Sequence, residues 1–349
     1  MRYGIIAENP IERLGLASGQ VPTPMLEPYG AGFGRTLMVA TKLGVFEALA
    51  EGPLAASVVA ERCGIDGRAT EKLMNLLVGM RYLRRSSDGA YRLTKLARTW
   101  LLQDSARSVR DMVLFKFLEW NWIEGLEAFV RTGEPLDVHA GMSPEDWRLY
   151  QRGMRAQAGL LGGWLARRLP MPPNATTMLD IGGSHGHLSV ALCRRHPALR
   201  SVVLDLPEAV EQAAPILAAE GMGDRVVHRA GNALTDDLGA DQYDLILAFS
   251  LVHHFDAETN RTLAARCARA LRPGGLFVIG DQMRPESPSG ASAQDLFFDL
   301  YFALTSRSGL WSSDEMADWQ RAAGLVTRRP IRLLMGQGPV LQIGERPAR

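Results

Sequence analysis

Residues 178–187 have the sequence Met-Leu-Asp-Ile-Gly-Gly-Ser-His-Gly-His, the most informative ten residues of the chain. Its first half predicts a buried strand that ends in Asp180, and its second half predicts a glycine-rich turn that opens a helix. Gly182 lets the backbone approach a ligand closely, and Gly186 allows the helix to pack against the strand. The stretch therefore predicts a small-ligand site at the first turn of an α/β domain.

Asp180 narrows the choice of ligand. A carboxylate directly before the turn would repel a pyrophosphate at the helix N-terminus, which weighs against a dinucleotide cofactor. An acid at this position suits a ligand with a cationic amine, such as the methionine end of S-adenosylmethionine (SAM). In the stricter D/E-x-G-x-G-x-G pattern the central glycine is replaced here by Ser184. The identity of the ligand therefore has to be inferred from the spacing of later motifs as well.

Later strands bring further polar residues to the same edge of the predicted sheet. The strand over 201–205 ends in Asp205, 25 residues after Asp180, where an acid binds ribose hydroxyls in mononucleotide-binding folds. A strand over 226–229 leads to Asn232, whose side chain is placed to meet an adenine edge. Strands over 243–249 and 276–280 follow, the second after a turn expected over residues 271 to 275. The predicted cofactor-binding residues are Asp180, Gly182, Gly183, Ser184, Asp205, Leu206, Gly231, Asn232, Ala233, Phe249 and Ser250.

Four motifs resemble those of one enzyme family. Residues 179–186, Leu-Asp-Ile-Gly-Gly-Ser-His-Gly, resemble its DVGGGxG motif, and residues 204–210, Leu-Asp-Leu-Pro-Glu-Ala-Val, resemble its DLPxV motif. Gly231-Asn232 stands where the family has Gly-Asp, and residues 251–256, Leu-Val-His-His-Phe-Asp, stand where it has LHDWxD. Together they resemble the class I SAM-dependent methyltransferases, and more narrowly the small-molecule O-methyltransferases that include plant caffeate, acetylserotonin and bacterial antibiotic tailoring enzymes. The resemblance implies SAM as cofactor and a Rossmann-like seven-stranded α/β sheet behind an N-terminal, mostly helical winged-helix dimerisation domain.

Composition fits an enzyme of a reducing compartment. The chain has 349 residues, 46% of them apolar, which is enough to fill the cores of two domains. Its formal net charge of +1 creates no overall field toward nucleic acid or acidic membranes. Cys63, Cys193 and Cys267 show no CxxC spacing, which indicates a cytoplasmic location and argues against a structural zinc site. We expect no membrane span, signal peptide or bound metal.

The chain divides into three predicted parts. Residues 1–105 predict a winged-helix-like dimerisation domain, residues 106–170 a helical link that covers the substrate, and residues 171–349 the SAM-binding domain. Residues 1–28 are rich in Pro and Gly, so we expect them to run over a surface or a partner subunit without a fold of their own. The resembled family pairs through its N-terminal domain, which implies a homodimer.

A winged-helix pattern fills most of the first part. Apolar residues at helical spacing predict a helix over 34–50, and shorter helices are expected over 55–63 and 69–80. A hairpin is expected over 82–93, around the Asp88-Gly89 turn. The same pattern occurs in DNA-binding proteins, but acidic side chains here balance the arginines, and nucleic acid is not an expected partner. A SAM-binding winged-helix regulator stays open as an alternative function.

His253 and Asp281 are the predicted catalytic pair. His253 follows the fourth strand and Asp281 follows the fifth, 28 residues later, so both fall at the carboxyl edge of the sheet, where ligands bind. The family match implies that His253 takes a proton from a phenolic hydroxyl and that Asp281 orients His253. His254 stands where the family has Asp, and residues 308–312, Ser-Gly-Leu-Trp-Ser, replace its GKERT motif. Methylation of carbon or nitrogen therefore stays open as well.

The expected acceptor is an aromatic small molecule of secondary metabolism. Most of the aromatic residues between positions 106 and 170 predict packing between helices, and we expect two or three of them to touch the acceptor. His139, His196 and His228 are expected in loops or at the surface. The predicted substrate contacts are Phe117, Trp120, Met154, His254, Phe298, Phe302 and Trp311.

Overall fold

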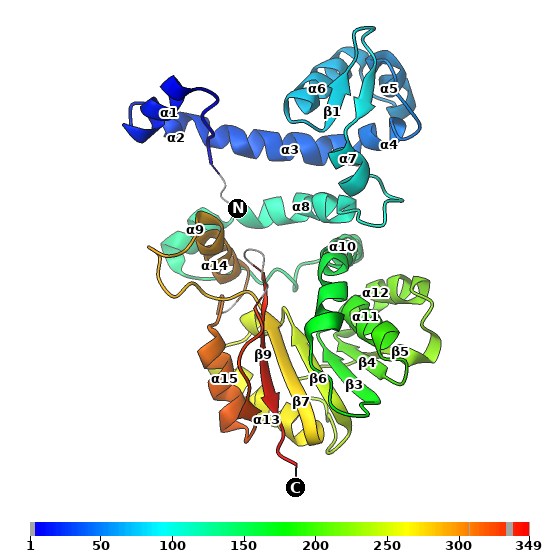
Figure 1. The fold of residues 1–349 in the computed structure, drawn as a ribbon, viewed down its shortest axis with the longest axis vertical. Coiled ribbons are helices and arrows are strands. Elements are labelled where there is room, and N and C mark those ends of the chain that lie inside the picture. The colour runs from blue at the N-terminus through cyan, green and yellow to red at the C-terminus, as the bar shows by residue number, and fades with distance from the viewer. Residues whose placement is uncertain (1–3, 307, 333–337, 349) are drawn as a thin grey trace. The chain divides into compact units, whose positions relative to one another are not determined.

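The computed structural model describes residues 4–306, 308–332 and 338–348. The chain forms two compact units, Arg2–Phe117 and Leu118–Arg349, which are coloured from blue to cyan and from cyan to red in Figure 1. The boundary between the units falls inside helix α8 (Arg110–Ile123). Each unit has a hydrophobic core of its own.

The N-terminal unit combines helices with one hairpin. Strand β1 (Leu83–Arg85) pairs antiparallel with β2 (Tyr91–Leu93) across the predicted turn. Phe46, Met74 and Tyr91 are buried at the centre of the unit, where the helices meet the hairpin. Its helices before α8 are α1 (Pro10–Ala17), α2 (Thr23–Leu26), α3 (Pro28–Lys42), α4 (Val45–Ala48), α5 (Ala56–Cys63), α6 (Gly67–Gly79) and α7 (Lys95–Trp100).

Two local predictions for this unit are wrong. Residues 1–28 contain the helices α1 and α2, and α1 forms because the Asn9 side chain accepts a hydrogen bond from the Glu12 N–H at 2.9 Å. The single helix predicted over 34–50 is divided into α3 and α4. Gly44 lies between them with φ of +78°, a left-handed conformation that ends a helix.

The C-terminal unit is built on a seven-stranded sheet with the order β5-β4-β3-β6-β7-β9-β8. The strands from β5 to β7 are parallel, whereas β9 runs antiparallel to both β7 and β8. This Rossmann-like sheet has the predicted number of strands, and β9 is its antiparallel member. The strands are β3 (Thr177–Ile181), β4 (Arg200–Asp205), β5 (Val226–Ala230), β6 (Tyr243–Phe249), β7 (Leu271–Asp281), β8 (Val326–Thr327) and β9 (Val340–Glu345).

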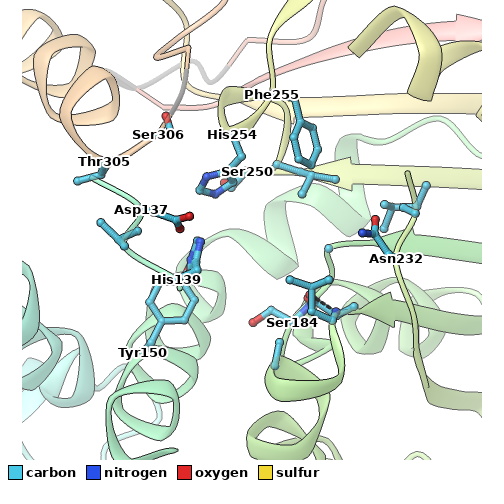
Figure 2. A pocket seen from close by; sticks show the side chains of 18 of the residues that line it. Asp137, His139, Tyr150, Ser184, Asn232, Ser250, His254, Phe255, Thr305 and Ser306 are labelled. Carbon is cyan, nitrogen blue, oxygen red and sulfur yellow. Dashed lines mark hydrogen bonds between the residues drawn. The ribbon is translucent and has the colours of Figure 1, made fainter. Parts of the chain in front are cut away.

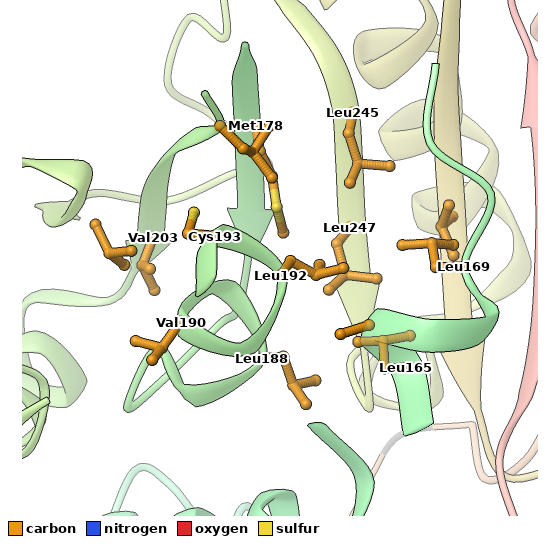
Figure 3. Close-up of a cluster of buried hydrophobic side chains, with 14 of the residues drawn as sticks. Leu165, Leu169, Met178, Leu188, Val190, Leu192, Cys193, Val203, Leu245 and Leu247 are labelled. Atoms are coloured by element: carbon orange, nitrogen blue, oxygen red, sulfur yellow. The ribbon is translucent and has the colours of Figure 1, made fainter. Parts of the chain in front are cut away.

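Helices cover both faces of this sheet (Figure 1). Leu245 and Leu247 of β6 point to one face, where they pack with Leu192 (Figure 3), and Ile246 and Ala248 point to the other. Because its central strands are buried on both faces, they have nearly continuous apolar sequences. The first face is covered by α10 (Pro144–Arg168), α11 (His187–Arg195) and α12 (Pro207–Ala219), and the second by α13 (Ala257–Ala270) and α15 (Ser313–Ala322).

Strand β7 is longer than predicted. The turn expected over residues 271 to 275 lies inside the strand as an irregularity, because Leu271 pairs with Tyr243 and Leu276 pairs with Leu245. Gly274 within it has φ of +79°. The sequence Gly-Gln-Gly-Pro at residues 336–339, between two apolar runs, predicts a hairpin turn, and this stretch lies partly outside the described residues. Within the part of the chain that the structure describes, no helix is both long and apolar enough to cross a membrane.

Candidate active site

The turn after β3 presents backbone at the carboxyl edge of the sheet. Gly182 has φ of +65°, and its N–H donates to the Leu204 carbonyl at 2.8 Å, which ties the turn to β4. A Cβ at Gly182 would lie 2.8 Å from the side chain of Leu251. Glycine is therefore required here both by conformation and by space. The turn leaves its backbone open to a ligand.

Asp180 lies buried beneath this turn. Its carboxylate accepts a hydrogen bond from the Ser189 hydroxyl at 2.6 Å, and a Cβ at Gly183 would lie 2.6 Å from its carboxyl carbon. Burial raises the pKa of Asp180 to about 7. The carboxyl group thus supports the turn from below, whereas the sequence predicted that it faces the amine of the ligand.

Asp205 ends β4 and fixes the turn from the side. Its two carboxylate oxygens accept hydrogen bonds from the N–H groups of Ser184 and Leu206, both at 2.8 Å. Burial raises the pKa of Asp205, and these two hydrogen bonds act in the opposite direction. His228 Nε2 lies 2.8 Å from the Ser184 carbonyl oxygen, so this histidine supports the turn and is not a free surface residue. Each carboxylate oxygen of Asp205 retains a lone pair for a ligand hydroxyl.

The loop after β5 forms the next part of the site. The N–H of Gly231 donates to the Asp205 carbonyl at 2.9 Å, and Asn232 follows with its N–H bonded to Asp236 at 3.0 Å. The Asn232 side-chain oxygen accepts from the Leu234 N–H at 2.9 Å. These bonds hold the Asn232 side chain at the wall of a cavity (Figure 2).

One cavity of about 760 Å³ joins these elements. Its size lies within the range of small-molecule sites, roughly 300 to 1,000 Å³. One wall contains eight of the predicted cofactor residues: Gly182, Ser184, Asp205, Leu206, Gly231, Asn232, Ala233 and Ser250. The opposite wall is formed by the loop of residues 134–139, called here the cover loop, with Trp147, Tyr150, His254, Thr305 and Ser306. Gln151 and Phe255 also line the cavity.

His253 and Asp281 form a buried pair beside this cavity. His253 lies in the short helix η2 (Val252–His254), and its Nδ1 is 3.0 and 2.9 Å from the two carboxylate oxygens of Asp281. The residues are 3% and 1% exposed. An ionised carboxylate only accepts hydrogen bonds, so Nδ1 carries the proton and Nε2 is left with a lone pair. The structure thus brings together the two predicted catalytic residues.

Two further imidazoles extend from this pair into the cavity. The ring centroid of His254 is 4.2 Å from that of His253 and 5.1 Å from that of His139. Both His139 and His254 line the cavity, although the sequence predicted a loop or surface role for His139. Burial lowers the pKa of both side chains, that of His254 well below its usual range, so both are neutral near pH 7.

Three residues that were predicted to contact the cofactor or the substrate lie near the catalytic pair and do not line the cavity. The ring centroid of Phe302 lies 4.3 Å from that of His253. Trp311 Nε1 donates to the Val252 carbonyl at 3.1 Å and so supports the segment that carries His253. Phe249 lies against β7, where it occupies the space that a Cβ at Gly280 would need.

The other predicted substrate residues lie elsewhere. Trp120 on α8, Met154 on α10 and Phe298 on α14 (Ala293–Thr305) are half-buried, and none belongs to the cavity wall in the described part of the chain. Phe117 belongs to the N-terminal unit, where two cationic side chains of α3 lie over its ring at 4.4 and 4.9 Å.

Sequence reasoning missed most of the wall opposite the turn. Trp147, Tyr150 and Gln151 lie on α10 at the i, i+3 and i+4 spacing of one helix face, a signal that could have identified them. Asp137 and His139 lie in the cover loop, whose sequence shows no periodicity. Their position depends on the hydrogen bond from the Leu136 N–H in the cover loop to the Leu304 carbonyl near the end of α14. A contact between segments so far apart in the chain cannot be predicted from a local sequence pattern.

The side chain of Gln151 tests whether SAM fits here. It is 1% exposed, its oxygen accepts a hydrogen bond from the Ser184 hydroxyl, and it lines the cavity. Its amide nitrogen has no hydrogen-bond partner among the described residues. A buried donor without a partner is costly, and a ligand acceptor such as the carboxylate of an amino acid would satisfy it. A buried amide donor and the lone pairs of Asp205 in one cavity fit a ligand such as SAM, which has an amino acid carboxylate and ribose hydroxyls.

Comparison with known proteins agrees with this geometry. A family model described as the O-methyltransferase domain matches residues 124–324, and one described as the O-methyltransferase dimerisation domain matches residues 30–103. All residues that line the cavity lie within the first of these matches. The helices and the hairpin of the N-terminal unit lie largely within the second.

Individual relatives cover nearly the whole chain. The 3-hydroxy-5-methyl-1-naphthoate 3-O-methyltransferase of Streptomyces sahachiroi is 30% identical over 85% of this chain and 87% of its own length. The mitomycin biosynthesis 6-O-methyltransferase of Streptomyces lavendulae is 30% identical over 95% of this chain and 96% of its own. The structure of human N-acetylserotonin methyltransferase in complex with SAM has the same fold, with a TM-score of 0.83, 20% identity, and 98% and 99% of the two chains covered.

Proposed function

The chain belongs to the O-methyltransferase family and is a SAM-dependent O-methyltransferase, and we propose that it methylates a phenolic hydroxyl of an aromatic small molecule in secondary metabolism. The observation that carries this proposal is the cavity itself. Asp205, which we assign to the ribose, and the imidazoles of His139 and His254 line a single space of about 760 Å³, and the ring of His254 lies next to that of His253, which pairs with Asp281. The 3-hydroxy-5-methyl-1-naphthoate named for one relative carries its hydroxyl on an aromatic ring and supports this substrate class.

We assign the cofactor to the wall formed by the turn and the loop after β5. Asp205 binds the ribose hydroxyls, Asn232 and Ala233 lie against the adenine, and Gln151 donates to the carboxylate of the amino acid end. When bound, SAM supplies a methyl group on a positively charged sulfur. The protein's part is to hold the acceptor oxygen in line with that methyl group, which accounts for much of the acceleration.

His253 is the proposed general base. A phenol has a pKa of about 10 and a histidine one of about 6.5, so complete proton transfer before attack would cost about 5 kcal/mol. The proton therefore moves to His253 Nε2 as the new bond forms. Asp281, 2.9 Å from Nδ1, fixes the tautomer that makes Nε2 available and stabilises the imidazolium that results. We propose Asp281 as a positioning residue, because it acts through His253.

We also propose that the enzyme is a homodimer that works in the cytoplasm. The match of residues 30–103 to a dimerisation domain supports the pairing. Ile11 and Leu14 on α1 are 83% and 71% exposed, an apolar surface that a second copy would cover. The free cysteines Cys63, Cys193 and Cys267 suit a reducing compartment. The same match to a dimerisation domain disfavours a DNA-binding regulator.

The test is to incubate the enzyme with SAM and a panel of phenols and to follow the release of S-adenosylhomocysteine. Mass spectrometry with fragmentation then locates the added methyl group. We expect it on oxygen. A methyl group on carbon or nitrogen would overturn the proposed chemistry, and so would binding of SAM with no transfer to any phenol of the panel.

A further inference from the structure

Several polar side chains gather at the end of the cavity away from the turn. His139 and Asp137 come from the cover loop, His254 from η2, and Thr305 and Ser306 from the end of α14. In Figure 2 they lie on one side of the cavity, and Ser184 and Asn232 lie on the other. The general base and the cofactor site do not account for them.

His139 is held rigidly in this cluster. Its ring stacks on Trp147 with centroids 5.3 Å apart and an interplanar angle of 14°, and it meets Tyr150 edge-on at 5.5 Å. The cover loop that carries it is fixed by a hydrogen bond of 2.7 Å from the Leu136 N–H to the Leu304 carbonyl. An imidazole fixed in this way presents the same nitrogen atoms to every ligand, which is what a recognition residue requires.

The cluster is rich in hydrogen-bond acceptors. The hydroxyl of Thr305 donates to the Tyr301 carbonyl at 2.8 Å, and that of Ser306 donates to the Phe302 carbonyl at 2.5 Å. Their oxygens therefore have only lone pairs left for a ligand. The carboxylate of Asp137 only accepts, and a neutral imidazole has one acceptor nitrogen beside its one N–H.

A wall of this kind matches a ligand that donates hydrogen bonds. A substrate carboxylate would lie against Asp137 and Glu134, which line the same cavity, and like charges repel. A free hydroxyl donates to an imidazole nitrogen or to Ser306 and can also accept from an imidazole N–H. A second hydroxyl thus satisfies the wall better than a carboxylate does.

From this geometry we infer that the acceptor is a vicinal diphenol, and that His139 and His254 select it through the hydroxyl that is not methylated. Neighbouring oxygens on one ring are about as far apart as two hydrogen-bonded oxygens, roughly 2.7 Å. The ring of His254 lies in the cavity wall next to that of His253, with centroids 4.2 Å apart, so a hydroxyl adjacent to the one that reacts at His253 would lie at His254. The inference rests on the proposed function, because it places the reacting hydroxyl at His253.

The test compares kcat/KM for 1,2-dihydroxybenzene with that for phenol, using His139→Phe, which keeps an aromatic ring on Trp147 but removes both nitrogens. We expect a preference of about tenfold or more for the diphenol in the parent enzyme, because the lost hydroxyl would leave buried polar groups unpaired. In His139→Phe we expect the preference to fall at least fivefold. His139→Gln keeps a donor and an acceptor and should recover part of it. The matched control, His196→Phe, removes an imidazole outside the cavity and should leave the preference unchanged.

Four other outcomes would contradict the inference. Equal rates with phenol and the diphenol in the parent enzyme would overturn it while leaving the proposed function intact. So would a preference for 2-hydroxybenzoate or 2-aminophenol over the diphenol, or a diphenol preference that survives His139→Phe in a variant with the thermal stability of the parent. A methyl group on carbon or nitrogen would overturn the proposed function and the inference together.

Discussion

Asp180 offers a prediction about stability, because its carboxyl group is buried under the turn that binds the cofactor. One carboxylate oxygen accepts from Ser189, and the other has no partner among the described residues. Replacing it by asparagine, as Asp180→Asn, keeps the shape of the side chain and removes the ionisation. The variant should therefore differ from the parent in how its free energy of unfolding depends on pH.

The sign and size of the effect follow from the pKa of Asp180. Burial raises this pKa from 3.8 to about 7, so the folded protein keeps a proton that the unfolded chain loses at lower pH. Ionisation of Asp180 therefore destabilises the folded state. This destabilisation is zero below about pH 4, grows as the pH rises, and reaches its full size above about pH 7. The gap between the two pKa values corresponds to about 4 kcal/mol, at 1.36 kcal/mol per pH unit.

Urea denaturation at several pH values measures this dependence. Six of the seven tryptophans lie in the C-terminal unit, so fluorescence follows its unfolding. We expect Asp180→Asn to gain about 4 kcal/mol relative to the parent between pH 4 and pH 8. The control is Asp224→Asn. Its hydrogen bond and ion pair with Arg200 lower the pKa of this exposed carboxyl group, so Asp224 stays ionised in both the folded and the unfolded chain between about pH 5 and pH 8. The difference in stability between the parent and Asp224→Asn should therefore not change with pH over that range. A difference between parent and Asp180→Asn that does not change with pH would refute the reasoning.

Three further predictions concern the turn, the cofactor and the assembly. Gly183→Ala should destabilise the protein by about 1 to 3 kcal/mol in thermal unfolding, because its Cβ would meet a buried carboxyl group at 2.6 Å, whereas Gly79→Ala, with open space around it, should be neutral or stabilising. Asp205→Ala should weaken S-adenosylhomocysteine binding about tenfold or more in calorimetry, since hydrogen bonds to a charged acceptor contribute about 1.5 to 3 kcal/mol each; unchanged affinity would refute its role. The parent should sediment as a dimer at micromolar concentration and the Ile11→Glu, Leu14→Glu double variant as a monomer, and a monomeric parent would contradict the pairing.

The sequence predicted the sheet because its signals are local and strong. The strand over 243–249 has the observed bounds of β6, and the turn at residues 182–186 and the acid at Asp205 fall at the observed edge. Two of the wrong predictions concern features that depend on a single residue. Gly44 divides one long helix, and Asn9 caps a helix in a segment whose composition predicts none.

The candidate site was only half predictable. The wall formed by the turn and the loop after β5 follows from motifs that lie directly after strands. The opposite wall depends on how α10, the cover loop and the end of α14 pack together, so His139 and Ser306 gave no signal of their own. For Asp180 the motif identified the residue, but it did not predict that the side chain is buried beneath Gly183.

The central claim is that His253, positioned by Asp281, is the general base, and single-turnover rates of methyl transfer to a diphenol test it most directly. We predict that His253→Ala lowers this rate about 10²- to 10⁴-fold, with a smaller loss of the same kind for Asp281→Asn. His254→Ala should cost about tenfold, because it removes recognition and not the base. A rate for His253→Ala within threefold of the parent, or a larger loss for His254→Ala than for His253→Ala, would contradict the account.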